Sequence, residues 1–448
     1  MFLSLKIIKP IWFFHLRSNG KILWPNPQQT EPNIRIDDQY LSIKSAILEA
    51  SFLMIMRGWI PPKDGDYISI GSKYFNHRPK ICDEFRFIRK NFNPLWSIIF
   101  TIYCILTLKN PVKIIKSYIK SNRISRIPLF SDLNVKHKFS DRDGLNLLDL
   151  EPPVRIIIPT LNRYDNLNNL LKDLENQKYN NFFITIVDQS NPFDENFYKN
   201  FKLDIRVIRQ NNPGLWKARN NAIMKTQENI IALLDDDSRI ESDWIINHLK
   251  CLDYFKVMIS SGVSISSVGA KVPENYSFFR LSDQIDTGNV FFYKEVFEIC
   301  GLFDEQFEGM RMGDGEFGIR SYKKGFISIS NPVSKRVHLK VKKGGLRQLG
   351  SWDAFRPTNI LGPRPIPSLI YLVLIYFDQE VLLRYFFKTV PFVLCPYSWK
   401  GTYRGYFLSL FLFISFFPFV LLQVSKSYRI AKKMLESGQK IRIIETTE

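Results

Sequence analysis

Short apolar runs alternate with helical patterns between residues 154 and 235. Apolar residues in the intervening segments recur three or four positions apart, as Leu167, Leu170, Leu171 and Leu174 do, which is the spacing of one helix face. We therefore predict helices over 164–176 and 215–226. The apolar runs predict strands over 154–159, 183–188, 205–210 and 230–235. Strands and helices that alternate at this length predict an α/β fold, with a mostly parallel sheet covered by helices on both faces.

The flanking regions have other patterns, and they divide the chain into four parts. Residues 1–123 are expected to form an α-rich accessory region to which the pattern assigns no role. Residues 124–153 mix polar and charged residues with short apolar pieces, which is typical of a linker. The α/β domain is expected over 154–345. Residues 346–448 contain strongly apolar segments and are expected to form a membrane-associated helical region.

Two apolar segments are candidates for helices that contact or cross a membrane. The run from Tyr406 to Val424 has nineteen uncharged residues with basic flanks, which fits one transmembrane helix kinked at Pro418. A membrane-embedded hairpin formed with the preceding segments and a buried helix of a soluble core are the alternatives. Residues 94–108 are uncharged but too short for a span, so a buried or interfacial helix is expected there. Because Lys113, Lys116 and Lys120 follow it, two interpretations stay open for this region, an accessory domain and a membrane-contacting arm.

The charge balance narrows the choice of partners. The 448 residues include 62 Lys and Arg against 43 Asp and Glu, a formal net charge of +19, which favours anionic partners. No nucleic-acid-binding motif is present, and the basic residues accompany the apolar C-terminal segments, so we expect a membrane and no nucleic acid. Five cysteines without CxxC spacing fit a reducing compartment. The expected location is the cytoplasmic face of a membrane, as a peripheral or single-pass protein.

Three consecutive carboxylates, Asp235, Asp236 and Asp237, end the apolar run 230–234. Ligands of open parallel sheets bind at the carboxyl ends of the strands, and Asp188 ends its own strand at the same edge. Crowded carboxylates repel one another unless a cation lies between them, and oxygen ligands suit Mg²⁺ or Mn²⁺ with a bound diphosphate. The alternative is an exposed acidic turn that caps the next helix.

A second group of acids lies in the glycine-rich segment 301–325. A helix is predicted to begin near Asp314, and the helix dipole favours an ionised carboxylate there, which could accept a proton from a hydroxyl nucleophile. The alternative is a plain helix cap followed by an internal pair between Glu316 and Arg320.

His338 lies in a stretch rich in Lys and Arg that could close over a diphosphate. A packed or surface histidine, and a polybasic strip on anionic lipid, are the alternatives. The basic residues around it are Lys335, Arg336, Lys340, Lys342, Lys343 and Arg347.

Taken in order, these motifs resemble those of the family 2 glycosyltransferases, which have the GT-A fold. The resemblance covers residues 154 to 343 and does not extend to the first 123. It is carried by Pro159-Thr160-Leu161-Asn162-Arg163, Asp188, Gly214 with Ala218-Arg219-Asn220, the Asp235–Asp237 triplet, Gly301-Leu302-Phe303-Asp304-Glu305, and Asp314-Gly315-Glu316-Phe317-Gly318-Ile319-Arg320. The last segment looks most like the branch with galactofuranosyl and rhamnosyl transferases.

The resemblance implies an inverting enzyme of the cell envelope that moves a sugar from a nucleotide diphosphate to a hydroxyl of a glycan or a lipid-linked glycan. A UDP-sugar is the expected donor, and a divalent metal, Mn²⁺ or Mg²⁺, is the expected cofactor. Asp314 matches the catalytic base, and Asp235, Asp237 and His338 match metal ligands. The expected substrate-binding residues are Thr160, Asn162, Arg163, Asp188, Arg219, Asp235, Asp236, Glu316 and Arg320.

Two departures from the family pattern matter. Gly313 replaces one member of the usual acidic pair before the helix, and the QxxRW motif of processive synthases is absent, since Gln348 and Trp352 occur as QLGSW. Two alternative functions therefore stay open. One is a non-catalytic membrane-bound relative that binds glycans or assists their assembly, and the other is a metal-dependent nucleotidyltransferase, which would release pyrophosphate.

Overall fold

The computed structural model describes residues 1–30, 34–62, 68–130, 146–266, 273–341, 345, 362–395, 399 and 402–444. The chain divides into two compact units, each described by itself. The first comprises Met1–His137 and Phe377–Lys388, and the second comprises Lys138–Tyr376 and Thr389–Glu448.

The first unit is helical around an aromatic core, as expected for the N-terminal region. Phe2 stacks on Phe87 with ring centroids 4.0 Å apart, and Trp24 and Phe52 are buried beside them. Its helices are α1 (Leu3–Ile8), α2 (Ile43–Met56), α3 (Gly71–Phe75), α4 (Ile81–Asn91), α5 (Leu95–Leu106), α6 (Pro111–Ser121) and most of α14 (Gln379–Thr389).

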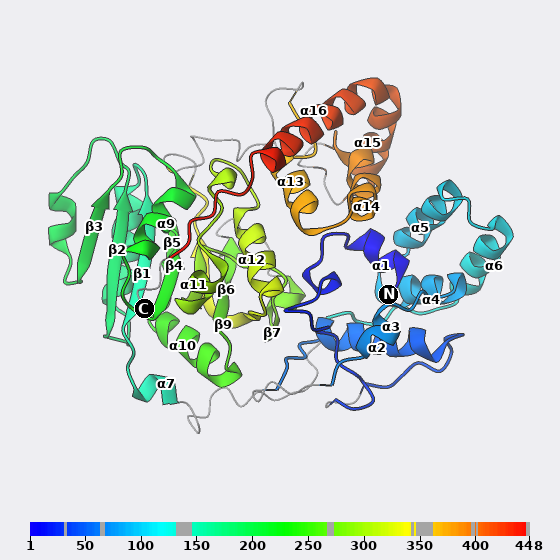
Figure 1. Cartoon of the computed structure of the whole chain (residues 1–448), viewed down its shortest axis with the longest axis horizontal. Helices are drawn as coiled ribbons and strands as arrows, with labels where there is room; N and C mark the ends of the chain where they lie inside the picture. The colour runs from blue at the N-terminus through cyan, green and yellow to red at the C-terminus, as the bar shows by residue number, and fades with distance from the viewer. Residues whose placement is uncertain are drawn as a thin grey trace. The chain divides into compact units, whose positions relative to one another are not determined.

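The second unit is built on one mixed sheet (Figure 1). Its first half is the predicted parallel set, β1 (Val154–Thr160), β2 (Phe182–Asp188), β3 (Ile205–Arg209) and β4 (Ile230–Leu234), in the order β3-β2-β1-β4. The order continues through β8, β6, β9 and β5, with β7 on β9. These strands are β5 (Ser238–Ile240), β6 (Ile259–Ser266), β7 (Arg280–Leu281), β8 (Asn289–Tyr293) and β9 (Ser328–His338).

Within this second half of the sheet, β6 and β9 are parallel, while the other pairings, including that of β8 with β4, are antiparallel. The sheet is therefore parallel where the sequence predicted it and mixed as a whole.

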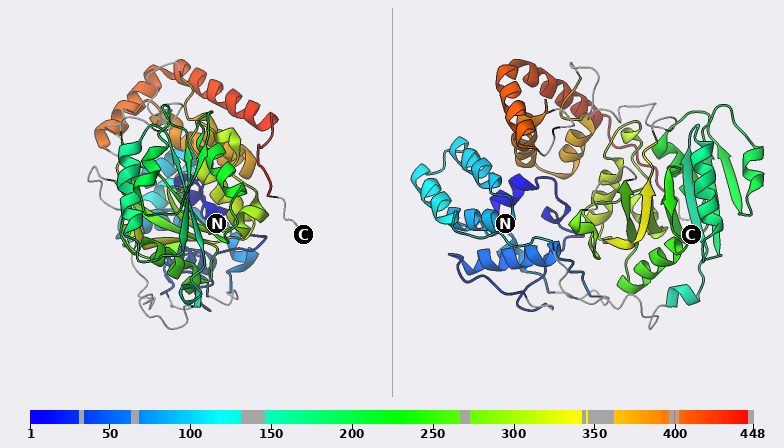
Figure 2. Two further views of the ribbon diagram at one scale, coloured as in Figure 1. Left: turned by 90° about the vertical axis from the view of Figure 1, so that its left-hand side faces the viewer. Right: turned by 180° about the vertical axis from the view of Figure 1, so that it is seen from behind.

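Helices lie on both sides of this sheet, which confirms the predicted α/β fold class (Figures 1 and 2). They are α7 (Asn146–Asp149), α8 (Tyr164–Glu175), α9 (Leu215–Met224), α10 (Trp244–Phe255), α11 (Glu295–Cys300) and α12 (Gly313–Lys323). Helix α9 packs against β1 and β2, whereas α10 packs against β6, β8 and β9. Strand β4 is buried along its whole length, as its unbroken apolar sequence requires of a strand covered on both faces.

The register of the parallel strands sets the position of the candidate site. Thr160 at the end of β1 pairs with Asp188 at the end of β2, and Ile157 pairs with Leu233 of β4. The segments that follow β1, β2 and β4 therefore leave the sheet at one edge, which is where the sequence placed Asp188 and the aspartate triplet.

The C-terminal apolar region differs from a single straight helix. Helices α15 (Tyr403–Ser415) and α16 (Phe417–Glu436) meet at Phe416 with a bend of 92°, and α13 (Pro367–Tyr376) packs against α16. Among the described helices, none alone is long and apolar enough to cross a membrane, although this bent pair passes that test together. Pro418 explains the break, because its ring excludes the preceding turn and it has no N–H to donate. The expected kink is present, but it is sharp enough to end one helix and begin another.

The segment after α16 returns to the α/β domain. The amide of Leu302 donates to the carbonyl of Arg442 at 2.8 Å, and the amide of Glu305 donates to that of Lys440 at 3.1 Å. Arg442 also forms an ion pair with Glu305 at 2.8 Å. Residues 439–444 are thereby held along the loop that precedes α12.

A buried ion pair in α12 provides a test of this packing. Arg320 donates to both carboxylate oxygens of Glu316, at 2.9 and 2.8 Å, and the Glu316 side chain is fully buried. Replacing Glu316 with Gln leaves a buried guanidinium without its counter-charge, so we expect the free energy of unfolding to fall by about 3–5 kcal/mol. Urea denaturation measures this change.

The matched control is Glu436→Gln in α16. Glu436 faces Lys432 at the same spacing, but both side chains are exposed. Its loss is expected to lower the free energy of unfolding by less than about 1 kcal/mol. Equal effects of the two substitutions would contradict the structural role assigned to the buried pair.

Candidate active site

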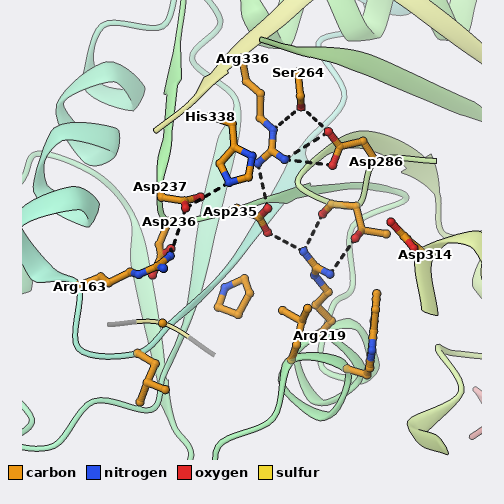
Figure 3. Close-up of a pocket in the computed structure, with 16 residues that line it drawn as sticks. Arg163, Arg219, Asp235, Asp236, Asp237, Ser264, Asp286, Asp314, Arg336 and His338 are labelled. Carbon is orange, nitrogen blue, oxygen red and sulfur yellow. Dashed lines mark hydrogen bonds and ion pairs between the residues drawn. The ribbon is translucent and has the colours of Figure 1, made fainter. Parts of the chain in front are cut away.

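A cavity of about 300 Å³ opens at the edge of the sheet where β1 and β4 end (Figure 3). Five carboxylates and three guanidinium groups line it, so acids outnumber arginines by two. The charged lining residues are Arg163, Arg219, Asp235, Asp236, Asp237, Asp286, Asp314 and Arg336, with His338 beside them.

Asp235 lies between two buried arginines. Its Oδ1 accepts from Arg219 at 2.8 Å, and its Oδ2 accepts from Arg336 at 2.9 Å. Burial alone would raise the pKa of Asp235, but Arg336 and Arg219 lower it below its usual range. Asp235 is therefore held as a carboxylate at neutral pH.

Asp236 and Asp237 share Arg163, whose Nη1 donates to Asp236 at 3.0 Å and to Asp237 at 3.2 Å. Thr160 donates its hydroxyl to Asp236 at 2.9 Å. Burial raises the pKa of Asp236 to about 7 against the pull of Arg163. Asp237 differs, because hydrogen bonding to His338 and the charge of Arg163 outweigh burial and lower its pKa.

The pairing of β5 with β9 brings His338 to the aspartate triplet. Ser238, the residue after Asp237, is the register partner of His338, and the amide of Leu339 donates to the carbonyl of Asp237 at 2.9 Å. His338 Nε2 consequently lies 3.2 Å from Asp237 Oδ2. The sequence predicted that these two residues act together, and the structure brings them together.

Arg336 joins the triplet to the opposite wall of the cavity. Besides Asp235 it contacts Asp286, at 3.1 and 3.2 Å, and donates to Ser264 at 2.5 Å. Gly288 lies beside the contact between Arg336 and Asp235, and a Cβ at this position would lie 2.1 Å from Asp235 Oδ2. A glycine is therefore required here for Arg336 and Asp235 to form their contact.

Asp314 enters the cavity from the first turn of α12 (Figure 3). Burial, with help from the negative charge of Asp286, raises its pKa to about 6. The amide of Gly315 donates to Asp314 at 2.8 Å and opposes that rise. A carboxyl group with this pKa is mostly ionised at pH 7 but binds a proton more readily than an ordinary aspartate, which suits a general base.

The missing acid at position 313 has a steric explanation. A Cβ on Gly313 would lie 2.4 Å from the ring of Trp216, which is buried and donates through Nε1 to the carbonyl of Phe307 at 3.0 Å. A glutamate or aspartate therefore has no room there while Trp216 occupies the cavity wall.

Five of the predicted substrate-binding residues do not line the cavity, and of these Thr160 lies directly behind it, where it contacts Asp236. Asn162 is exposed and joins the loops after β1 and β2, with its side-chain oxygen accepting from the amide of Asn191. Asp188 is buried and accepts from the hydroxyls of Tyr164 and Tyr198, both at 2.7 Å. Glu316 and Arg320 pair with each other, and Glu316 also accepts from Tyr376 and Gln439. Their contacts hold loops and helices in place, which matches the alternative of an internal Glu–Arg pair.

The other predicted residues, Thr160, Arg163, Arg219, Asp235, Asp236, Asp237, Asp314 and His338, converge on the cavity or directly behind it. Of the basic loop, Lys342, Lys343 and Arg347 lie outside the described residues. Asp286, Ser264 and Thr287 line the cavity and were missed, because they lie in a segment without a motif. One sequence pattern could have indicated these residues. Asp286 and Gly288 directly precede the apolar strand β8, and acids and glycines also occur in the other loops that line the cavity.

Asp235, Asp237 and His338 are the expected metal ligands. The described residues contain no group of three or more His, Cys, Asp or Glu arranged around one metal position. Asp237 and His338 are nevertheless adjacent, and Asp235 is partly exposed to the same cavity. Carboxylate oxygen and imidazole nitrogen are donor types that suit Mn²⁺. Asp237 and His338 supply two adjacent donors of these types, while both oxygens of Asp235 accept from Arg219 and Arg336.

A model of the family described as "Glycosyl transferase family 2" matches residues 155–303. This range is about a third of the chain and contains most of β1, the aspartate triplet and Arg219, so this part of the chain is similar to the family 2 glycosyltransferases. The remaining cavity residues, Asp314, Arg336 and His338, lie after the matched range and come from the same sheet unit.

Among curated proteins, Glycosyltransferase GlyA of Streptococcus pneumoniae serotype 4 is 25% identical over 170 residues, which are 36% of this chain and 23% of that protein. The match therefore spans less than a quarter of that relative. Among solved structures, S. aureus TarS 1-349 in complex with UDP-GlcNAc has 15% identity and a TM-score of 0.42, over 64% of this chain and 92% of that one. Mannosyltransferase PcManGT from Pyrobaculum calidifontis, in complex with GDP-Man and Mn²⁺, has 16% identity and a TM-score of 0.42, over 64% and 88%.

The contact between Gly313 and Trp216 makes a testable prediction. Gly313→Ala should lower the free energy of unfolding by about 1–3 kcal/mol, because the added methyl group overpacks a buried ring. The control is Gly315→Ala in the same helix, where the nearest atom is the Met312 methyl group at 2.9 Å, the movable end of a side chain. Thermal unfolding compares the two, and equal midpoints would contradict the steric explanation of Gly313.

Proposed function

We propose that this chain is an inverting glycosyltransferase that moves a sugar from a nucleotide-diphosphate sugar to a hydroxyl group of a glycan or lipid-linked glycan. The observation that carries the proposal is one cavity, in and beside the part of the chain that is similar to the family 2 glycosyltransferases, that contains both the aspartate triplet and Asp314. The first supplies a place for the donor, and the second a base for the acceptor.

The donor diphosphate is assigned to the triplet side of the cavity. A divalent metal held by Asp235, Asp237 and His338 would neutralise the diphosphate as it leaves. Arg219 and Arg336 keep Asp235 ionised, and Arg163 orients Asp236 and Asp237 by the contacts described above. A UDP-sugar is the donor we expect, since the family resemblance points to one.

The acceptor hydroxyl is assigned to the side of Asp314. Its oxygen attacks the anomeric carbon as the bond to the diphosphate oxygen breaks, and its proton passes to the Asp314 carboxylate. One displacement inverts the configuration, and the transition state has oxocarbenium character. The products are the glycosylated acceptor and the nucleoside diphosphate.

The non-catalytic alternative rested on Gly313, and the steric explanation of Gly313 removes that support. A nucleotidyltransferase would release pyrophosphate, so the identity of the released product separates it from the proposed function. No contact in the cavity favours it.

The acceptor is assigned to a membrane, with the protein at its cytoplasmic face. Support comes from the bent pair α15 and α16, where Phe407, Phe411 and Ile414 are 75%, 66% and 67% exposed. Side chains of this size are normally covered, and basic residues follow them in α16. A buried helix of a soluble core does not fit these exposures.

Asp314→Asn tests the catalytic base. UDP release from a panel of UDP-sugars, measured with octyl glycosides as acceptors and Mn²⁺ present, should fall by about 10²- to 10⁴-fold. Because the Asp314 pKa is raised to about 6 and the base must be ionised, the wild-type rate should increase as pH rises through that value and level off above it.

The control for this test is Asp286→Asn. It leaves the base in place but removes a negative neighbour that raises the Asp314 pKa, so the rising limb should move to lower pH. Turnover by Asp314→Asn at the wild-type rate would remove Asp314 from its role, whereas pyrophosphate release would favour the nucleotidyltransferase.

Calorimetric titration with UDP, with and without Mn²⁺, tests the donor site. Mn²⁺ should strengthen UDP binding, and Asp237→Ala should weaken the Mn²⁺-dependent binding by about 100-fold, since even the loss of a residue behind a metal ligand costs 10- to 100-fold. Glu295→Ala, which removes an exposed acid from the first turn of α11, should bind as the wild type does.

Other outcomes of the titration are informative. If dTDP or GDP binds with Mn²⁺ and UDP does not, the donor class changes while the site stands. If no nucleotide binds to the folded protein, the proposed function is wrong and the non-catalytic alternative returns.

A further inference from the structure

Helices α5 and α6 form a hairpin in the first compact unit that packs on α4, and α5 also contacts α1 and Phe387 of α14. Phe100 and Cys104 of α5, and Ile114 of α6, are fully or almost fully buried. The same helices carry a second apolar surface that is exposed. It comprises Ile98, Ile102, Ile105, Leu106, Val112, Ile115 and Ile119, with Leu108 at the tip.

The exposed residues follow helical spacing, so they form an apolar stripe on each helix. At about 100° per residue, Val112, Ile115 and Ile119 lie on one stripe of α6, about 160° from its packed stripe. Lys113, Lys116 and Lys120 fall between the two stripes. Leu108, between the helices, is 93% exposed. A helix that is apolar on both sides is expected in a large core or in contact with lipid.

The charge of the hairpin identifies what covers this face. From Leu95 to Phe130 the chain has six basic residues, Lys109, Lys113, Lys116, Lys120, Arg123 and Arg126, and no Asp or Glu. All but Lys109 are exposed. A second copy of the hairpin would bring like charges together, which disfavours a symmetric contact. An anionic bilayer accepts the apolar stripe among its acyl chains and the lysines among its head groups.

We propose that the α5–α6 hairpin is a docking surface for anionic membranes. The hairpin belongs to the first compact unit, whereas the cavity and α15–α16 belong to the second, so the proposal goes beyond glycosyl transfer and does not rest on it. Leu108 and the apolar stripe enter the interfacial layer, and the basic residues select anionic lipid. This gives the N-terminal helical unit a function that its sequence alone left open.

The test is co-sedimentation of the full chain with vesicles of phosphatidylcholine alone or mixed in equal amounts with phosphatidylglycerol. Because α15 also exposes apolar side chains, all variants carry Phe411→Ser and Ile414→Ser. In that background, replacing Lys113, Lys116 and Lys120 with Gln should weaken binding to mixed vesicles roughly 100-fold, which corresponds to about fivefold for each charge. Replacing Ile102, Leu108 and Ile115 with Ser should weaken binding by about tenfold or more.

The matched control replaces Lys21, Lys73 and Lys80 with Gln, since these are also exposed lysines of the first unit. This control changes the net charge by the same amount as the hairpin lysine variant, and it should alter the affinity for mixed vesicles by less than about twofold. Circular dichroism and the UDP titration check that each variant is folded, and they report the catalytic unit independently of lipid binding.

Three results would overturn the proposal. Equal loss of vesicle binding in the hairpin and control lysine variants would show that only net charge matters. No loss in the hairpin lysine variant would show that these lysines do not contact anionic lipid. A dimer in solution that Leu108→Ser converts to a monomer would make a second copy the occupant of this face.

Discussion

Clustered negative charge is the constraint on which the candidate site depends. Five carboxylates share one small cavity, and without compensation their repulsion would unfold the edge of the sheet or force them to bind protons. Arg163, Arg219 and Arg336 are each fixed between two or more oxygen acceptors, so the carboxylates keep defined directions. The carboxylates outnumber the arginines, and burial raises the pKa of Asp236 and of Asp314, so part of the repulsion is relieved by proton binding. In the proposed function the remaining negative charge would favour a divalent cation together with the diphosphate that the cation carries.

Local patterns in the sequence predicted the parts of the structure that depend on neighbouring residues. The strands β1 to β4, the helices α8, α9 and α12, and the position of the triplet after β4 all followed from apolar spacing and from where each run ends. Asp314 was found because a glycine-rich segment passes into a helix. The parts that were missed depend on strand register over long distances. Asp286 meets Arg336 across 50 residues, and no spacing in the sequence indicates that pair.

The same distinction applies where tertiary packing decides the partner of a residue. Asp188, Glu316 and Arg320 have the residue types of a site, and in the structure they contact tyrosine hydroxyls and each other. At Gly313 the sequence shows that an acid is absent, and only the structure shows that Trp216, nearly a hundred positions earlier, leaves no room for one. The apolar C-terminal run was expected to form one kinked helix or a hairpin, and it forms two helices that meet near Pro418 and point in different directions.

The return of residues 439–444 to the loop around Leu302 makes the catalytic domain discontinuous in sequence. A fragment cut after β9 would leave the amides of Leu302 and Glu305 without their carbonyl acceptors and would uncover Gly301, where Ile441 now packs. The domain therefore cannot be transplanted as residues 154–345 alone. In gene fusions or recombination, the segment after α16 and the loop before α12 must therefore be inherited together.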